Sequence, residues 1–163
     1  IDYVIIVSKL RHCTTVVKED IFKNFFFKRV VSAAGYIPNT ESLETFEKIQ
    51  KSIKEGNNIL MFPEGTRSVP GTPLTLKRGA ANISLRAEVP IQMVYINISE
   101  SLLTKGNPWY KIPKNRALYY LKNGERIEPN SFLKTGIATS LAARHLTKYI
   151  KQLLEGEVNL CKK

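Results

Sequence analysis

The chain has 163 residues, of which 43% are hydrophobic, and this composition excludes an intrinsically disordered protein. A chain of this length can bury a sizeable core within one domain. Its 25 lysines and arginines outnumber the 14 acidic residues, so the net charge is +11 and a polyanionic partner is favoured, either nucleic acid or an anionic membrane surface.

The rest of the composition narrows the class of protein. Cys13 and Cys161 are far apart and lack a paired spacing, which argues against a disulfide framework or a zinc site and favours a reducing compartment. No apolar run has the length of a membrane span. No zinc-finger, RNA-recognition or helix-turn-helix signature accompanies the basic charge. We therefore expect no bound metal and no nucleic acid, and a membrane phospholipid surface as the partner.

The first part of the chain alternates short apolar runs with longer helical patterns. Residues 1–8, taken alone, are typical of a buried strand because they are rich in β-branched side chains. A second strand is expected over 13–18, and a helix from about residue 22 that ends near Gly35. Residues 40–55 predict an amphipathic helix capped by Gly56. Its core residues are expected to be Leu43, Phe46, Ile49 and Ile53.

Three consecutive phenylalanines, Phe25, Phe26 and Phe27, are followed by Lys28 and Arg29. Three adjacent rings on a helix cannot all face one core. Two interpretations are open at this point. The segment is either a membrane contact, where the rings enter the interface and the basic groups meet phosphates, or a helix that is buried on most sides.

The sequence FPEGTRS, from Phe62 to Ser68, follows a short apolar run that is expected to be a strand. The ladder must stop at Pro63, because proline has no N–H to donate. Ligands of open α/β sheets bind at the carboxyl ends of strands. Gly65 tolerates backbone angles that other residues resist, and the planar guanidinium of Arg67 suits phosphate. On the residues alone, a phosphate-binding loop and a polar turn with an incidental Glu–Arg pair are equally open.

Lys77 and Arg78 precede a helix that is expected over residues 79–87. The free N–H groups and positive dipole end of that helix suit an anion, although its first small residues also fit a purely structural role in close packing. Further strands are expected over 91–98 and 117–121. A final helix is expected from about residue 132 to Leu154, with Leu141, Leu146, Tyr149, Ile150 and Leu153 as its packing face. In the long loop before the last strand, Trp109 and Tyr110 are either an interfacial anchor or a satellite core.

The FPEGTRS block closely resembles the phosphate-binding block of the glycerophospholipid acyltransferases, the lysophosphatidic acid acyltransferase-like family. Residues 77–81 resemble the basic-Gly-Ala stretch that follows this block, and 89–91 resemble the family's valine-proline-isoleucine strand start. The resemblance implies transfer of a fatty acyl group from acyl-CoA or acyl-carrier protein to the hydroxyl of a lysophospholipid, such as 1-acylglycerol-3-phosphate. It implies no cofactor or metal, and a membrane-associated protein at the cytoplasmic face.

The family's second hallmark is a histidine and an aspartate separated by four variable residues, with a helix beginning there. Asp2 stands where the aspartate belongs, so the resemblance implies that the catalytic histidine precedes Ile1 and that Asp2 orients it. His12 and His145 lack this spacing and are interpreted as a loop residue and a helix residue. The resemblance also gives Glu64 a catalytic role in holding the acceptor or its arginine. It assigns substrate binding to Phe62, Pro63, Gly65, Thr66, Arg67 and Lys77.

These observations predict an α/β fold, a single layered domain over residues 1–155 with a mixed β-sheet flanked by helices, followed by a frayed tail over 156–163. Two alternatives stay open. The family usually has an arginine in the segment that corresponds to residues 35–39, and its absence here leaves room for an acceptor that is not a glycerophospholipid. A chain without the upstream histidine would instead be a non-catalytic basic membrane-binding module.

Overall fold

The computed structural model describes residues 2–23, 25–40, 42–65, 72–100, 113–133 and 136–160. Within these ranges, the side chains of Ile21, Phe26, Phe27 and residues 158–160 are not described. The chain divides into two compact units, Ile1–Phe62 and Pro63–Lys163, and each is described by itself. The prediction of one domain over residues 1–155 therefore stays a prediction.

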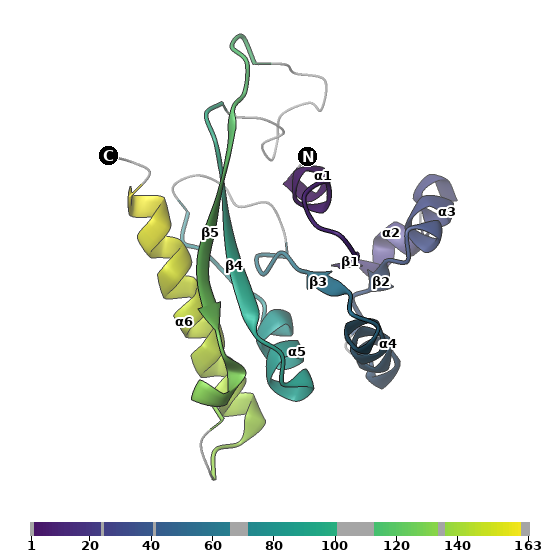
Figure 1. Ribbon diagram of the computed structural model, residues 1–163, viewed down its shortest axis with the longest axis vertical. Helices are drawn as coiled ribbons and strands as arrows, with labels where there is room; N and C mark the ends of the chain where they lie inside the picture. The colour runs from purple at the N-terminus through teal and green to yellow at the C-terminus, as the bar shows by residue number, and fades with distance from the viewer. Residues whose placement is uncertain are drawn as a thin grey trace. The chain divides into compact units, whose positions relative to one another are not determined.

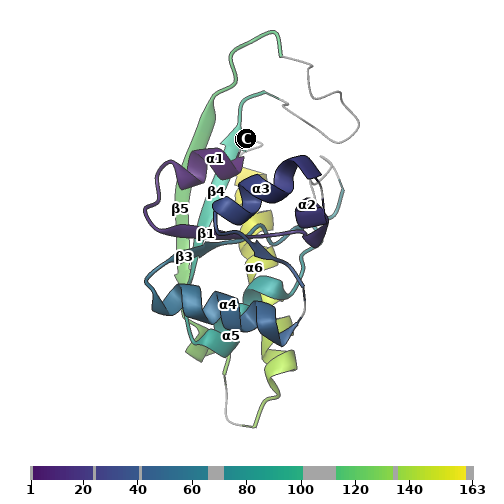
Figure 2. The same cartoon turned by 90° about the vertical axis from the view of Figure 1, so that its right-hand side faces the viewer.

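The first unit is a parallel sheet flanked by helices. Its three strands lie in the order β2-β1-β3, with bounds Cys13–Val17 for β1, Ile37–Pro38 for β2 and Asn58–Leu60 for β3. Its helices are α1 (Asp2–Val7), α2 (Glu19–Lys23), α3 (Phe25–Ala33) and α4 (Leu43–Lys54). Helices α1 and α3 lie on one side of the sheet and α4 lies on the other (Figures 1 and 2).

The amino-terminal segment is a helix, so the interpretation of residues 1–8 as a buried strand is wrong, whereas the helix implied by the family resemblance is confirmed. Composition misled because β-branched residues favour strands only weakly and packing overrides that preference. The expected strand at 13–18 is confirmed as β1. The helix expected from residue 22 begins earlier and is two helices, α2 and α3.

Helix α4 has a defined cap at each end. The side chain of Ser42 accepts a hydrogen bond of 3.2 Å from the backbone N–H of Thr45. At the other end, Gly56 adopts a left-handed backbone, with φ of +84°, and its N–H donates to the carbonyl of Ile53. The N–H of Asn57 donates to the carbonyl of Ser52, which completes a Schellman motif. The prediction that Gly56 caps this helix is confirmed.

The core face of α4 differs from the expected one at its first turn. Ile49 is 2% exposed, and Phe46 and Ile53 are half-buried, but Leu43 is 76% exposed and is not a core residue. Thr45 is buried in the first turn instead, because its hydroxyl can donate to the carbonyl of Pro38 at the end of β2. Apolar spacing alone did not show which end of the helix overhangs the sheet.

The second unit is an antiparallel strand pair that packs on two helices. Its elements are α5 (Gly79–Ala87), β4 (Ile91–Ile98), β5 (Tyr119–Ile127), the 3₁₀ turn η1 (Pro129–Ser131) and α6 (Thr139–Leu160). The ladder between β4 and β5 is irregular between Gln92 and Val94, and α6 lies along this strand pair (Figure 1). The predictions for residues 79–87 and 91–98 are confirmed to the residue. Strand β5 overlaps the strand expected over 117–121 but both begins and ends later.

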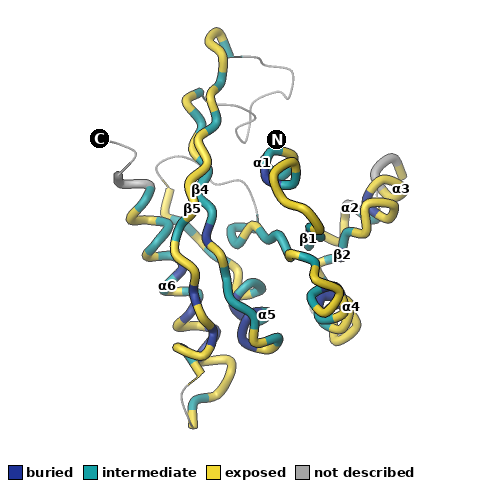
Figure 3. The backbone as a smooth tube through the Cα atoms, viewed as in Figure 1, coloured by how far each residue is buried: buried dark blue, intermediate teal, exposed yellow. Residues whose placement is uncertain are grey.

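The core of the second unit lies where α5, α6 and β4 face one another (Figure 3). Ala142, Ala143 and Leu146 are 0% exposed, and the small alanine side chains let α6 approach its neighbours closely. Ile150 is buried as expected, but Leu141 is 42% exposed, so its placement in the packing face is wrong. The other members of this core are Ala81, Leu85, Met93 and Ile127.

Helix α6 begins at Thr139 and runs to Leu160, beyond the expected end at Leu154, and it includes part of the expected tail. The parallel first sheet and the antiparallel second ladder, each with its helices, confirm the α/β class. None of the helices in the described part of the chain is both long enough and apolar enough to cross a membrane.

We predict that Leu146→Ala lowers the free energy of unfolding by about 2–5 kcal/mol, because it leaves a cavity in a fully buried site. Leu141→Ala is the matched control on the same helix and should cost less than about 1 kcal/mol, since that residue is already 42% exposed. Urea unfolding measures both values. Equal losses for the two variants would contradict the assigned core face.

Candidate active site

The Phe62–Ser68 block follows the carboxyl end of a parallel strand, as the sequence predicts. Strand β3 ends at Leu60, so the ladder stops before Pro63. Phe62 is 43% exposed and is the last residue of the first unit. Pro63, Glu64 and Gly65 are half-buried and form a turn in the second unit. Two of the predicted substrate-binding residues, Thr66 and Arg67, lie outside the described residues.

Gly65 and Lys77, which are far apart in sequence, come together at this turn. Gly65 has a left-handed backbone with φ of +66°, which confirms that the position needs a permissive residue. The backbone N–H of Lys77 donates a hydrogen bond of 2.7 Å to the carbonyl of Pro63. A Cβ atom placed on Gly65 would lie 3.3 Å from Cγ of Lys77. The stem of Lys77 therefore crosses the turn directly over the glycine.

The contact places a cation at the block. Lys77 is exposed, so its apolar stem can cover Gly65 while its ammonium group stays in water. The half-buried carboxylate of Glu64 comes from the same turn. A turn that combines backbone N–H groups with an adjacent ammonium group suits an anion, and a phosphate is the anion that the sequence predicts.

Helix α5 begins at Gly79, and Arg78 is its N-cap residue. The guanidinium carries only donors, so it makes no capping hydrogen bond with the first N–H groups of the helix, which leaves them open to an acceptor. The packing interpretation of the small residues is confirmed at Ala81, which is 1% exposed in the core of the second unit, whereas the anion site stays a prediction. The start of α5 thus packs firmly while both preceding cations stay exposed.

Asp2 lies in the first turn of α1, and that turn is fixed to the first sheet. The ring of Tyr3 meets the ring of Tyr36 edge to face, with centroids 5.3 Å apart. Burial, together with a hydrogen bond to Tyr36, raises the pKa of Tyr3 to about 12. Ile6, one turn later on the same face, is 5% exposed. Because Tyr36 precedes β2, these contacts hold the Asp2 backbone at a defined place beside the sheet.

The two histidines and Cys13 are not placed as catalytic groups. His12 is in the bend before β1 with φ of 52°, and His145 is exposed on α6, so both structural interpretations are confirmed. Burial raises the pKa of the Cys13 thiol, which disfavours the nucleophilic thiolate. Over the described ranges, no cluster of three His, Cys, Asp or Glu side chains is placed to hold a metal ion.

Comparison with known proteins agrees with this arrangement. Residues 1–97 match the family model described as Acyltransferase, and this stretch includes Asp2, the Phe62–Ser68 block and Lys77. The match covers more than half of the chain. The chain belongs to the acyltransferase family.

A solved structure shows how far the likeness extends. The acyltransferase chain shares its fold with the crystal structure of the 1-acyl-sn-glycerophosphate (LPA) acyltransferase PlsC from Thermotoga maritima, with a TM-score of 0.64 and 22% sequence identity. The alignment covers 99% of this chain and 61% of that enzyme, so the chain spans about three fifths of its relative's length. A search of curated protein sequences found no significant match.

The aromatic segment of this acyltransferase lies on α3. Phe25 is 87% exposed and Val30 is 61% exposed, while Lys28 and Arg29 are also exposed. Val31, on the same helix, is buried at 4% exposed. The interpretation of a helix buried on most sides is therefore wrong for Phe25. The side chains of Phe26 and Phe27 lie outside the description, and the membrane contact stays a prediction.

We predict that Gly65→Ala costs more stability than Gly35→Ala. Both glycines have φ of +66°, so both variants should lose about 1–2 kcal/mol from backbone strain. Gly35 has nothing within 4 Å of the added methyl group, whereas at Gly65 the methyl group meets Lys77. Urea unfolding of each variant gives the comparison.

A double-mutant cycle tests whether Lys77 causes the difference. Lys77→Ala removes Cγ, so Gly65→Ala in that background should cost about as much as Gly35→Ala. A coupling of at least about 0.5 kcal/mol between Gly65 and Lys77 is expected. Additive losses would show that the lysine stem does not constrain the turn.

Proposed function

We propose that the protein transfers a fatty acyl group from a thioester donor to the hydroxyl of a lysophospholipid such as 1-acylglycerol-3-phosphate. The family match carries this proposal, because it spans both Asp2 and the phosphate-binding block. The acceptor is supported by the activity of the Thermotoga maritima enzyme, a 1-acyl-sn-glycerophosphate acyltransferase with the same fold. The donor is acyl-CoA or acyl-carrier protein, and both serve the same chemistry.

The proposed step requires a base, because a hydroxyl is a poor nucleophile at neutral pH. In the family this base is the histidine that the resemblance implies ahead of Ile1. Asp2 would accept a hydrogen bond from its imidazole, fix its tautomer and stabilise the imidazolium that forms during attack. The substrate supplies the oxygen nucleophile that a serine supplies in a hydrolase. The first turn of α1 suits this role because Tyr3 and Ile6 hold it against the sheet.

The block would hold the acceptor. Arg67 would bind the acceptor phosphate with two parallel hydrogen bonds, and Glu64 would orient that arginine or the acceptor. Lys77 would add a second cation, since its stem already lies over Gly65. Backbone N–H groups beside Gly65 are the candidates for stabilising the oxyanion of the tetrahedral intermediate. No cofactor or metal enters this proposed step.

The headgroup of the acceptor is less constrained than the reaction. Residues 35–39 contain no arginine, so the phosphate would rely on Arg67 and Lys77. This gap favours an acceptor with fewer phosphate contacts than lysophosphatidate receives in the family. A lysophospholipid panel, assayed beside a long-chain alcohol, would rank the acceptors directly.

Acyl transfer by the full-length protein tests the proposal. With radiolabelled acyl donor and lysophosphatidate in membranes, Arg67→Ala should abolish detectable transfer, because the loss of hydrogen bonds to a charged group costs about 1.5–3 kcal/mol each. Asp2→Asn should lower kcat by at least about 100-fold with little change in the acceptor KM, since it acts through the base.

Matched controls come from exposed positions of the same residue types. Asp20→Asn, in the first turn of α2, and Arg116→Ala, before β5, should retain wild-type transfer. Wild-type rates for Asp2→Asn or Arg67→Ala would overturn the assigned roles. Absence of transfer by the unmodified full-length protein, combined with intact vesicle binding, would favour the non-catalytic membrane-binding module.

We also propose that α3 docks the protein on the cytoplasmic face of a membrane. The exposed ring of Phe25 is followed one turn later by exposed Lys28 and Arg29, which is the pattern of an interfacial helix. A basic residue near an anionic leaflet contributes about 1 kcal/mol to binding. The net charge of +11 has the same sign and would add to this attraction.

Vesicle sedimentation tests the docking. The triple variant Phe25→Ser/Lys28→Gln/Arg29→Gln should bind vesicles of phosphatidylcholine and phosphatidate at least about tenfold more weakly than the unmodified protein. The matched control on α4, Leu43→Ser/Lys48→Gln/Lys51→Gln, removes one exposed apolar side chain and two exposed cations as well. Equal weakening by the two triple variants would show that only total charge matters.

A further inference from the structure

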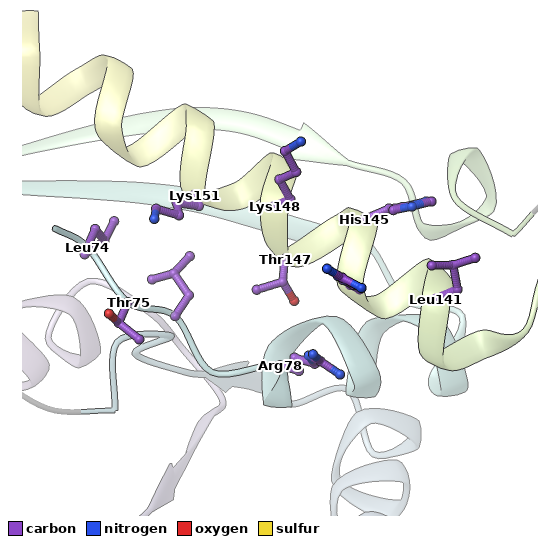
Figure 4. A pocket seen from close by; sticks show the side chains of 10 residues that line it. Leu74, Thr75, Arg78, Leu141, His145, Thr147, Lys148 and Lys151 are labelled. Atoms are coloured by element: carbon purple, nitrogen blue, oxygen red, sulfur yellow. The ribbon is translucent and has the colours of Figure 1, made fainter.

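A groove of about 520 Å³ lies within the second unit, between residues 74–78 and one face of α6 (Figure 4). Leu74 and Thr75 belong to the segment that leads to α5, and Arg78 is the N-cap residue of that helix. The opposite wall is formed by α6 from Leu141 to Lys151. None of its lining residues belongs to the Phe62–Ser68 block.

The described side chains that line the groove include basic groups and no acidic one. Arg144, Lys148 and Lys151 recur at helical spacing on α6 and line the groove together with His145. Arg78 lines it from the start of α5 (Figure 4). No described acidic residue forms an ion pair with Arg78, Arg144 or Lys148. Lys151 alone has such a partner, Glu155 on the next turn, at 3.5 Å.

The basic side chains of the groove repel one another, and a bound anion would reduce this repulsion. Cations four residues apart on a helix, such as Arg144 and Lys148, repel each other and destabilise the helix by a few tenths of a kcal/mol. Several cations around one concavity raise the local potential more than the same charges spread over a convex surface. An anion in the groove would relieve that repulsion. The guanidinium groups of Arg78 and Arg144, which both line the groove, are suited to phosphate.

The groove is also partly apolar. Leu141, which sequence periodicity places in the core, is 42% exposed and lines the groove instead. Leu74 and Leu76 line the opposite wall, and Leu76 packs onto the core of the second unit. A free inorganic anion would leave these leucines in water, whereas a phosphate that carries an apolar group would cover them.

The groove is continuous in sequence with the phosphate-binding block. Leu76 and Arg78, which line it, are the two neighbours of Lys77, whose stem lies over Gly65. A ligand that moves residues 76–78 would therefore also move Lys77. The groove is thus placed to hold a second phosphate group beside the segment that closes the block.

We propose that this groove binds an organic phosphate ester with an apolar neighbour, at a site outside the Phe62–Ser68 block. Two sources have this chemistry, namely the headgroup region of an anionic phospholipid and the phosphorylated nucleotide of a CoA thioester. The inference does not depend on acyl transfer, because binding is measured without turnover.

Titration of the purified full-length protein tests the site in two arms. One arm uses adenosine bisphosphate, the nucleotide end of CoA, in a calorimeter. The other uses vesicles of phosphatidylcholine with and without phosphatidate. Arg144→Gln/Lys148→Gln should weaken binding at least about tenfold in one arm or both, because hydrogen bonds to charged groups contribute about 1.5–3 kcal/mol each. The arm that weakens identifies the source.

Lys114→Gln/Arg116→Gln is the matched control, since it removes the same charge from exposed positions in the same unit that do not line the groove. Urea unfolding of both double variants verifies that each is folded, which is expected because all four side chains are exposed. Equal affinities for the two double variants in both arms, or no binding by the unmodified protein, would overturn the proposal. Loss of transfer with unchanged binding would concern the proposed reaction and not this site.

Discussion

The hydrogen bond from the backbone N–H of Lys77 to the carbonyl of Pro63 is the constraint on which the candidate site depends. It joins the segment that follows β3, which ends at Leu60, to the segment that precedes α5, which begins at Gly79. Pro63 cannot extend the ladder, and Arg78, next to Lys77, is the N-cap residue of the helix. Within this closed turn, Gly65 takes the left-handed backbone that lets the Lys77 stem pass above it.

Helix α6 has an apolar face that packs in the core of the second unit and a basic face that lines the groove. Ala142, Leu146 and Ile150 recur at helical spacing and bury one face against the rest of the second unit. Arg144 and Lys148 recur at the same spacing on a face that stays exposed and lines the groove. The buried face can position the charged one because the core residues on it are nearly or fully enclosed. Packing of the apolar face therefore also determines where the basic side chains of α6 lie.

Sequence reasoning succeeded where one local rule determined the result. Residues 91–98 form a strand to the residue, and Gly56 caps α4, because strand alternation and a left-handed cap are properties of short segments. It failed at Leu43 and Leu141, since periodicity identifies an apolar face but not where that face runs past its partner. For residues 2–7 composition was misleading, and only the likeness to a family gave the helix. The contact between Lys77 and Gly65 was beyond reach, because it depends on how a distant segment returns to the turn.

Two positions in the structure combine an exposed apolar side chain with neighbouring basic groups. Phe25 and Leu141 are apolar and exposed, and the like charges of Arg144 and Lys148 on α6 destabilise that helix by a few tenths of a kcal/mol. Sequences are expected to be locally consistent except where function requires otherwise. In both places an apolar side chain stands beside basic groups. An amphiphilic phosphate can contact both kinds of group. A simple anion would leave the apolar side chain in water, and a purely apolar partner would leave the basic groups without a counter-charge.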